Sequence, residues 1–255
     1  MSEMVYGKMF HRNIGFLTQN EQEKISTLSI GIAGAGGDGG LLSERLVRFG
    51  IKRIVLADPE VFDVENINRQ FAATAESIGL NKAVAVGAEL NRINPHAEVI
   101  VYEQGITSAN ISEFVSRADV IIDEIEFTIP ELSIMLAREA RRQGKYVFTG
   151  ANIGWGASVI CFAPNGMTFE EFFSYDEDSK TIDATRYAKD FPEYLDRKML
   201  TDVLEGKMSI PSISSAVGLV ASLLSSALIL HCVDRKKPLI APEFTHFDMH
   251  ELGFL

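Results

Sequence analysis

The sequence predicts an α/β fold in which a doubly wound, mostly parallel sheet is followed by added antiparallel strands and a crossover segment. Three observations carry this prediction. Short apolar runs alternate with stretches of helical spacing along most of the chain, a glycine-rich turn follows the first run, and the second run ends on an acid. Such alternation indicates βαβ units with right-handed crossovers, and it places ligands at the carboxyl ends of the strands.

The elements are expected in a regular order along the chain. Strands are predicted over residues 28–33, 53–58, 98–102, 118–122 and 145–150, and helices over 41–49, 82–93, 111–115 and 130–143. A glycine-rich stretch at 150–156 marks the passage to the antiparallel strands. The result is a Rossmann-like arrangement.

The glycine-rich turn is the first candidate binding element. It contains Gly34, Gly36, Gly37 and Gly39 between the first strand and the first helix of the sheet, so backbone amides can close around a phosphate there. Asp58 ends the next strand, where a carboxylate can accept hydrogen bonds from ribose hydroxyls. This spacing alone fits NAD or FAD equally well.

A group of polar and basic residues after Asp58 favours a triphosphate over a dinucleotide. The group consists of Asn66, Arg69 and Gln70, followed by Lys82. Cations and amides of this kind suit three clustered phosphates. With the doubled glycine loop and the acid that closes the next strand, they make the chain resemble the ubiquitin-activating-enzyme-like family, the ThiF/MoeB/HesA group.

The resemblance covers most of the chain and implies an activity. Members transfer AMP from ATP to a C-terminal carboxylate and release pyrophosphate, with Mg²⁺ as cofactor. The implied partner is the tail of a ubiquitin-like or sulfur-carrier protein, or a small peptide. A tRNA-bound carboxylate is a further alternative, which the acidic composition disfavours. Arg12 resembles the arginine that reaches the partner's ATP, so the resemblance also implies a homodimer, with Arg12, Arg69 and Lys82 as the catalytic cations.

Three positions depart from the family pattern, and one of them is Phe127, which stands where the family has a polar residue. The family's magnesium-binding Asp falls at Glu126, which can still bind the ion through oxygen, and Asp123 is the alternative ligand. Asp38 occupies a loop position that the family usually fills with an apolar residue. We expect Asp38 to cap the following helix, where a negative charge is favourable.

The cysteines do not indicate metal binding or thioester chemistry. Cys161 lies in an apolar strand and Cys232 closes an uncharged helix, so both are interpreted as buried hydrophobic residues. We expect no zinc and no catalytic cysteine. The segment 165–208, where such a cysteine would be expected, carries many acids and aromatic residues, Phe191 among them. It is either a polar connector with aromatic anchors or a surface that covers the adenylate and docks a partner.

The 255 residues suit a single domain, 1–255, because no Pro/Ser-rich linker or repeat divides them. We expect an N-terminal arm over 1–27, the crossover or lid segment over 165–208, and a buried or dimer-interface helix over 209–233. The uncharged helix is long enough to suggest a membrane span, but several serines and Gly218 interrupt it, so no membrane is expected.

Composition bounds the cellular setting and the partners. The formal net charge of -11 argues against general binding to nucleic acid, because phosphates call for clusters of Lys and Arg. Two apparently unpaired cysteines and the lack of a cleavable apolar leader favour a reducing, cytoplasmic location.

Two other functions stay open on the sequence alone. One is an oxidoreductase that binds NAD or FAD, which would tolerate Arg69→Ala. The other is a non-catalytic scaffold of the same fold, which would bind ATP without releasing pyrophosphate because of its changes at Glu126, Phe127 and Asp38.

Overall fold

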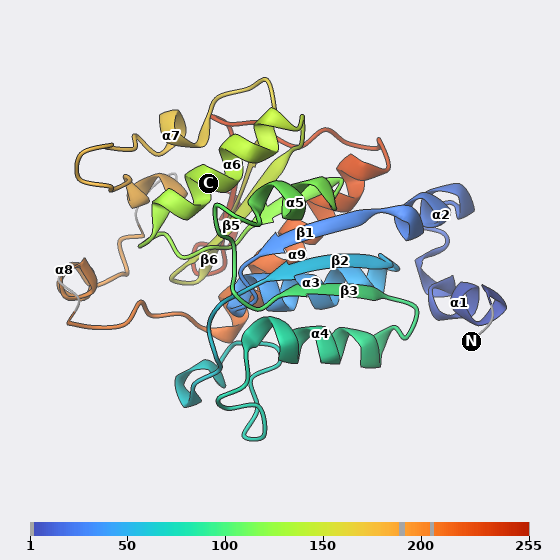
Figure 1. Cartoon of the computed structure of the whole chain (residues 1–255). Coiled ribbons are helices and arrows are strands. Elements are labelled where there is room, and N and C mark those ends of the chain that lie inside the picture. Colours follow the sequence, from blue (N-terminus) through green and yellow to red (C-terminus); the bar gives the residue numbers. More distant parts are fainter. Residues whose placement is uncertain (1–2, 189–191, 205–206, 255) are drawn as a thin grey trace.

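A computed structural model describes residues 3–188, 192–204 and 207–254. These residues form an eight-stranded sheet in the order β3-β2-β1-β4-β5-β6-β7-β8 (Figure 1). The first five strands in this order run parallel, and β6, β7 and β8 are antiparallel additions. The strands are β1 (Ser29–Ala33), β2 (Arg53–Ala57), β3 (Glu98–Tyr102), β4 (Val120–Asp123), β5 (Val147–Ile153), β6 (Gly156–Phe162), β7 (Thr245–Asp248) and β8 (Gly253–Phe254).

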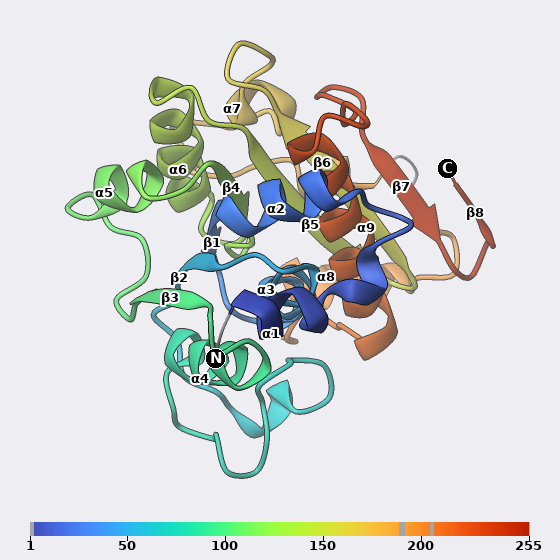
Figure 2. The same ribbon diagram turned by 90° about the vertical axis from the view of Figure 1, so that its right-hand side faces the viewer.

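Helices cover both faces of the sheet and enclose two hydrophobic cores. One core lies under α3, α4 and α9, and the other lies under α5, α6 and α7, as the end-on view in Figure 2 shows for α4 and α6. The α-helices are α1 (Glu3–Met9), α2 (Gln19–Thr27), α3 (Gly37–Phe49), α4 (Lys82–Ile93), α5 (Ile111–Ser116), α6 (Pro130–Arg142), α7 (Phe169–Phe172), α8 (Arg197–Leu204) and α9 (Ser214–Cys232). Three 3₁₀ turns are η1 (His11–Asn13), η2 (Val64–Asn66) and η3 (Ala184–Tyr187).

The order of the strands creates a topological switch point. From β1 the chain winds outward through β2 and β3, then returns to β4 on the other side of β1. In the register of this pair, Ala33 lies beside Asp123, so the loops after β1 and β4 leave the sheet at neighbouring positions. Such a crevice is where doubly wound sheets bind ligands.

The predicted α/β class and doubly wound sheet are confirmed, and one difference in an element boundary concerns the glycine-rich stretch before α3. The helix begins at Gly37, inside the glycine-rich stretch, rather than at residue 41. A glycine is normally weak in a helix, but a Cβ on Gly39 would lie 2.0 Å from the carbonyl oxygen of Gly34. Close approach of the loop to the helix therefore requires glycine here.

Helix α9 is long and apolar enough to cross a membrane by length and composition. In the structure it packs against α3, β5 and β6. Its buried members of the hydrophobic core are Ala221, Leu224, Leu228 and Ile229. The observed helix starts at Ser214, a few residues after the predicted start at 209.

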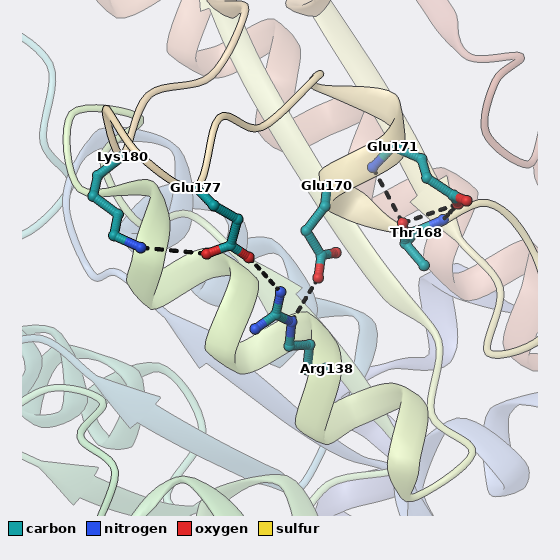
Figure 3. A network of polar contacts seen from close by, with 6 residues as sticks. All are labelled: Arg138, Thr168, Glu170, Glu171, Glu177 and Lys180. Carbon is teal, nitrogen blue, oxygen red and sulfur yellow. Dashed lines mark hydrogen bonds and ion pairs between the residues drawn. The ribbon is translucent and has the colours of Figure 1, made fainter.

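The first part of the crossover segment packs on β6 and contacts α6. Phe169, Phe172 and Phe173 are buried beside Phe162 of β6, and the buried Tyr187 packs on Phe173. Outside this aromatic cluster, Arg138 of α6 forms ion pairs with Glu170 and Glu177 (Figure 3). These residues act as the aromatic anchors that one interpretation of the sequence expected. Phe191 lies outside the described residues.

Candidate functional site

The loop after β1 closes tightly against the loop after β4. Gly34 has a φ of +102°, and a Cβ at this position would lie 2.2 Å from the carbonyl oxygen of Glu124. Gly36, which has no side chain, is the N-cap of α3. Amide groups in the first turn of a helix lack intrahelical acceptors, so this loop presents N–H donors and the positive end of a helix dipole.

Asp58 ties the end of β2 to the glycine loop. Its Oδ2 accepts a hydrogen bond of 2.7 Å from the amide of Ala35, and its Oδ1 accepts one of 2.8 Å from the amide of Glu60. Burial raises the pKa of this carboxyl, while the two amide hydrogen bonds oppose that shift. The predicted ribose acid therefore lies at the loop.

Arg69 and Gln70 flank the N-terminus of α3. The Cγ of Arg69 lies 4.0 Å from the position that a Cβ on Gly37 would take, and the Nε2 of Gln70 lies 3.6 Å from the corresponding position on Gly36. The Arg69 guanidinium donates to the carbonyl of Glu65 and to Oδ1 of Asn68. The structure thus brings both predicted residues to the glycine loop.

Asn66 and Lys82 each contact a residue close by in the structure, Asp63 and Glu60 respectively. The Oδ1 of Asn66 accepts a hydrogen bond from the amide of Asp63, which holds η2. Lys82 is the first residue of α4, and its Nζ lies 2.5 Å from Oε2 of Glu60. Only 8% of the Lys82 side chain is exposed. A cation near the positive end of a helix needs an anion beside it, and Glu60 supplies one.

Arg12 does not join the other predicted residues within this chain. It is exposed on η1, and its neighbour Asn13 donates a hydrogen bond to the carbonyl of Phe49, at the C-terminal end of α3. The glycine loop lies at the opposite end of that 13-residue helix, which is about 20 Å long. Figures 1 and 2 likewise place α1 and α2 where β1 begins, away from the loop where it ends.

The two predicted metal ligands differ in position. Asp123 is buried at the end of β4, where its Oδ1 accepts from the amide of Ile125 and the hydroxyl of Ser133. Burial raises its pKa to about 6. Glu126 is exposed and accepts a hydrogen bond of 3.3 Å from the hydroxyl of Thr128. Of the two, only Asp123 points into the buried part of the site.

Glu124, which the sequence analysis did not select, lies between these two acids and contacts the glycine loop. Its Cβ lies 3.2 Å and 3.3 Å from the positions that Cβ atoms on Gly34 and Gly39 would take. Its Oε1 accepts a hydrogen bond of 2.9 Å from the amide of Gly150. Burial raises the pKa of Glu124 well above its usual value, and the charges of Asp38 and Asp123 raise it further.

Asp38 is not the helix cap that the sequence suggested. The N-cap of α3 is Gly36, so Asp38 lies within the first turn, and its Oδ2 accepts a hydrogen bond of 2.7 Å from Nδ2 of Asn152. Burial raises the pKa of Asp38 to about 7, against the opposing charge of Arg69. Asn152 of β5 is therefore the hydrogen-bond partner of Asp38.

Asn152 extends this contact into a chain of hydrogen bonds. The hydroxyl of Ser212 donates to Oδ1 of Asn152, and Nδ2 of Asn68 donates to the carbonyl of Ser212. The chain joins α3, β5, the segment before α9 and the Asn-Arg-Gln cluster. No sequence signal marked Asn152, because its role depends on strand pairing across the sheet.

Within the described ranges, no group of three or more His, Cys, Asp or Glu side chains could hold a metal ion by itself. Cys161 is buried in β6 and Cys232 is half-buried at the end of α9. Burial raises the pKa of both thiols, to about 12 for Cys232.

Comparison with known proteins identifies the family. Residues 10–254 match the model of the ThiF family. The chain belongs to the ThiF family. It is 26% identical over 165 residues to the adenylyltransferase and sulfurtransferase UBA4 of Candida albicans, which is 62% of this chain and 36% of that protein. It is 29% identical over 127 residues to the tRNA threonylcarbamoyladenosine dehydratase of Bacillus subtilis, which is 49% of this chain and 50% of that protein.

A solved structure shares the fold of this ThiF-family chain. The Escherichia coli MccB structure with ATP superimposes with a TM-score of 0.71 and 18% identity, over 92% of this chain and 65% of that chain. At this identity the likeness shows the fold alone. The ThiF-family chain described here spans half or less of the length of the two curated relatives.

Proposed function

We propose that this ThiF-family protein is an ATP-dependent adenylyltransferase. One observation carries the proposal: Asp58, Arg69 and Gln70 meet the glycine loop at the switch point of the sheet. A carboxylate and two donors around a helix N-terminus suit the ribose and the phosphates of ATP. The names of UBA4 and of the MccB complex with ATP agree with this activity.

The proposed reaction joins a carboxylate to AMP. An oxygen of the acceptor carboxylate attacks the α-phosphorus, the bond from this phosphorus to the bridging oxygen breaks, and pyrophosphate leaves. Amides at the start of α3, together with Arg69 and Lys82, would hold the phosphates and offset the repulsion between two anions. No general base is needed, because the carboxylate is ionised at neutral pH.

A magnesium ion is the expected companion of ATP, and the donors at the end of β4 fit a hard cation. The Oδ2 of Asp123 is buried without a hydrogen-bond partner among the described residues. Asp123 or Glu126 would hold the ion in this proposal. When bound, the ion would neutralise charge on the phosphates.

The acceptor is proposed to be the tail of a ubiquitin-like or sulfur-carrier protein, or a small peptide. The relative from Candida albicans is named as an adenylyltransferase and sulfurtransferase, and MccB has been crystallised with MccA. The match to the tRNA threonylcarbamoyladenosine dehydratase favours a second candidate, a carboxylate on tRNA. The net charge of -11 speaks against it.

A homodimer is proposed because Arg12 lies far from the loop of its own chain. In a twofold pair the partner's arm could carry this arginine to the nucleotide. A reducing cytoplasmic setting without zinc also stays a proposal. So does the lack of a thioester step, which the raised pKa values of the Cys161 and Cys232 thiols support.

ATP–pyrophosphate exchange with candidate carboxylate tails tests the proposed activity. Arg69→Ala and Lys82→Ala should each abolish exchange, while Lys237→Ala, a change in an exposed lysine after α9, serves as the comparison. Exchange that survives in both variants would contradict the proposal. ATP binding without exchange for any acceptor would favour the scaffold alternative, and tight binding of NAD or FAD would favour the oxidoreductase.

A further inference from the structure

A chain of hydrogen bonds runs from Arg69 to the first turn of α3 by way of the segment before α9. The Arg69 guanidinium donates to Oδ1 of Asn68 at 2.8 Å, and Nδ2 of Asn68 donates to the carbonyl of Ser212 at 3.0 Å. The hydroxyl of Ser212 donates to Oδ1 of Asn152 at 2.8 Å, and Nδ2 of Asn152 donates to Oδ2 of Asp38 at 2.7 Å. A cation proposed to hold phosphate is thereby connected to the helix that begins at the glycine loop.

The members of this chain come from both sides of the switch point. Asn68 follows β2 and Asn152 belongs to β5, and these strands lie on opposite sides of β1 in the sheet order β2-β1-β4-β5. Ser212 contacts both sides, through its carbonyl on one and its hydroxyl on the other. The segment before α9 is therefore tied to the two sides of the crevice by one residue.

Every bond in the chain donates in the same direction, from the guanidinium toward the carboxylate. Arg69 can only donate, so it takes Oδ1 of Asn68 and leaves Nδ2 of that amide for the carbonyl of Ser212. At the other end a carboxylate oxygen of Asp38 takes Nδ2 of Asn152 and leaves Oδ1 for the hydroxyl of Ser212. Hydrogen bonds that follow one another in this way polarise each other. Loss of one bond is thus felt by the rest of the chain.

We propose that Asn68, Ser212 and Asn152 are positioning residues for the transfer of AMP, because they hold the Arg69 guanidinium and the segment before α9 in place at the glycine loop. The inference rests on the proposed function and adds three residues to it. They act through Arg69 rather than on the nucleotide. It also gives a role to the acid at loop position 38, which is the acceptor at the end of the chain.

An exchange of donor and acceptor between α3 and β5 tests the proposal. N152D is nearly isosteric, but it turns an oxygen instead of an N–H toward Asp38, so the bond between these positions is lost. D38N alone keeps an amide oxygen that can accept from Asn152. In the double variant D38N/N152D the amide is on α3 and the carboxylate is on β5, so the same bond forms in the opposite direction.

The remaining variants remove one member at a time. Asn68→Ala removes the side chain that contacts Arg69, and Ser212→Ala removes the hydroxyl that contacts Asn152. Asn91→Ala, on the exposed side of α4, is the matched control for the first change. Ser226→Ala is the control for the second, because the exposed Ser226 donates only to a carbonyl of its own helix. ATP–pyrophosphate exchange gives kcat and the KM for ATP of each variant, and thermal unfolding gives its melting temperature.

The expected result is a loss of at least about tenfold in kcat for N152D, Ser212→Ala and Asn68→Ala, with a smaller change in the KM for ATP. A displaced arginine still attracts the phosphates of ATP, but it no longer fits the transition state. D38N should keep the original kcat, and D38N/N152D should recover most of the kcat that N152D loses. Both control variants should match the original chain. A merely structural role would lower the melting temperature and leave the kcat of the folded protein unchanged.

Several outcomes would overturn the inference. An original kcat in N152D would do so, as would a double variant that recovers nothing. If N152D fails to fold, Ser212→Ala decides, because it removes a single hydroxyl. If the original chain shows no exchange with any acceptor, the proposed function fails, and amide hydrogen exchange over residues 209–217 then tests the tie by itself. Exchange there should speed up in N152D and slow again in the double variant, and equal rates in all three would show that no such tie exists.

Discussion

Single glycines show how strongly the loop depends on individual residues. Gly39→Ala would place a Cβ 2.0 Å from the carbonyl oxygen of Gly34, whereas a Cβ on Gly218 of α9 meets nothing within 4 Å. We expect Gly39→Ala to cost about 2 kcal/mol or more of unfolding free energy, and to abolish nucleotide binding. Gly218→Ala should gain about 0.5–1 kcal/mol. Urea denaturation of both variants measures these changes, and equal stabilities would contradict the close approach.

Asp38 predicts a dependence of stability on pH. Its pKa is raised from 3.8 to about 7 by burial, so the folded state holds the proton more tightly than the unfolded state. Its contribution to stability is therefore present below the unfolded pKa and is lost as pH rises through the folded value. The charge of Arg69 lowers the pKa of Asp38, and the charge of Asp38 in turn raises the pKa of Glu124.

Asp38→Asn removes this titration and keeps an acceptor for the amide of Asn152. Its melting temperature should exceed that of the original chain by a margin that grows from about pH 5 to about pH 8. Asp178→Asn, which alters an exposed acid, should show no such trend. A constant margin for Asp38→Asn across this range would contradict the burial of the carboxyl.

Sequence reasoning found the residues whose role depends on chain order and missed those whose role depends on pairing in space. Asp58, Arg69 and Gln70 come after the loop at the spacing of the motif, and the structure brings them to the loop. Glu124 and Asn152 reach the loop only because β4 lies beside β1 and β5 lies beside β4. Spacing along the chain carries no signal for such neighbours.

At the scale of elements, the crossover segment is held to α6 by apolar packing and by ion pairs of unequal weight. Phe173 is fully buried in the aromatic cluster, whereas the Arg138 side chain is 59% exposed where it pairs with Glu170 and Glu177 (Figure 3). Large-to-small changes in a core cost far more than the loss of solvated ion pairs.

We therefore expect Phe173→Ala to lower the unfolding free energy by about 3–5 kcal/mol, and Arg138→Ala by about 1 kcal/mol or less. Chemical denaturation followed by circular dichroism measures both changes. A larger effect for Arg138→Ala than for Phe173→Ala would show that the ion pairs, rather than the aromatic cluster, fix the segment.

Element boundaries were predictable where the hydrophobic pattern had clear ends. Helix α4 begins and ends where the sequence placed it, because Asn81 caps it and Asn94 closes it. Strand β5 continues three residues beyond its predicted end at 150, because it pairs with β6 in a hairpin. That pairing is a tertiary contact, which the local pattern of Gly150 to Gly156 does not contain.

At the scale of the whole molecule, the fold follows from the alternation of strands and helices, but the sheet order does not. Apolar runs show that a strand is buried without showing its neighbours. The return of the chain to β4 on the far side of β1 creates the crevice. It places the loop with Gly34 beside Asp123, so the site belongs to the assembled sheet.

The distance between Arg12 and the glycine loop predicts complementation between subunits. Arg12→Ala and Lys82→Ala should each be inactive alone, because each lacks one cation of the proposed composite site. After mixing and refolding, half of the dimers carry one intact site, so exchange should return to about a quarter of the original level.

Mixing Arg69→Ala with Lys82→Ala gives the control for this experiment. Arg69 and Lys82 are proposed to act on the same nucleotide within one chain. In a hybrid dimer of these two variants, one site lacks Arg69 and the other lacks Lys82, so no exchange should return. Recovery in the control, or none in the Arg12 mixture, would contradict a site shared between two copies.

The central claim is that the loop at the switch point holds the phosphates of ATP. A crystal structure with α,β-methylene-ATP tests it most directly. We predict phosphates on the amides between Gly36 and Gly39, with Arg69 and Lys82 directed toward them and the ribose at Asp58. An occupied site with Arg69 and Lys82 turned away from the phosphates, or a flavin or nicotinamide bound in their place, would contradict the account.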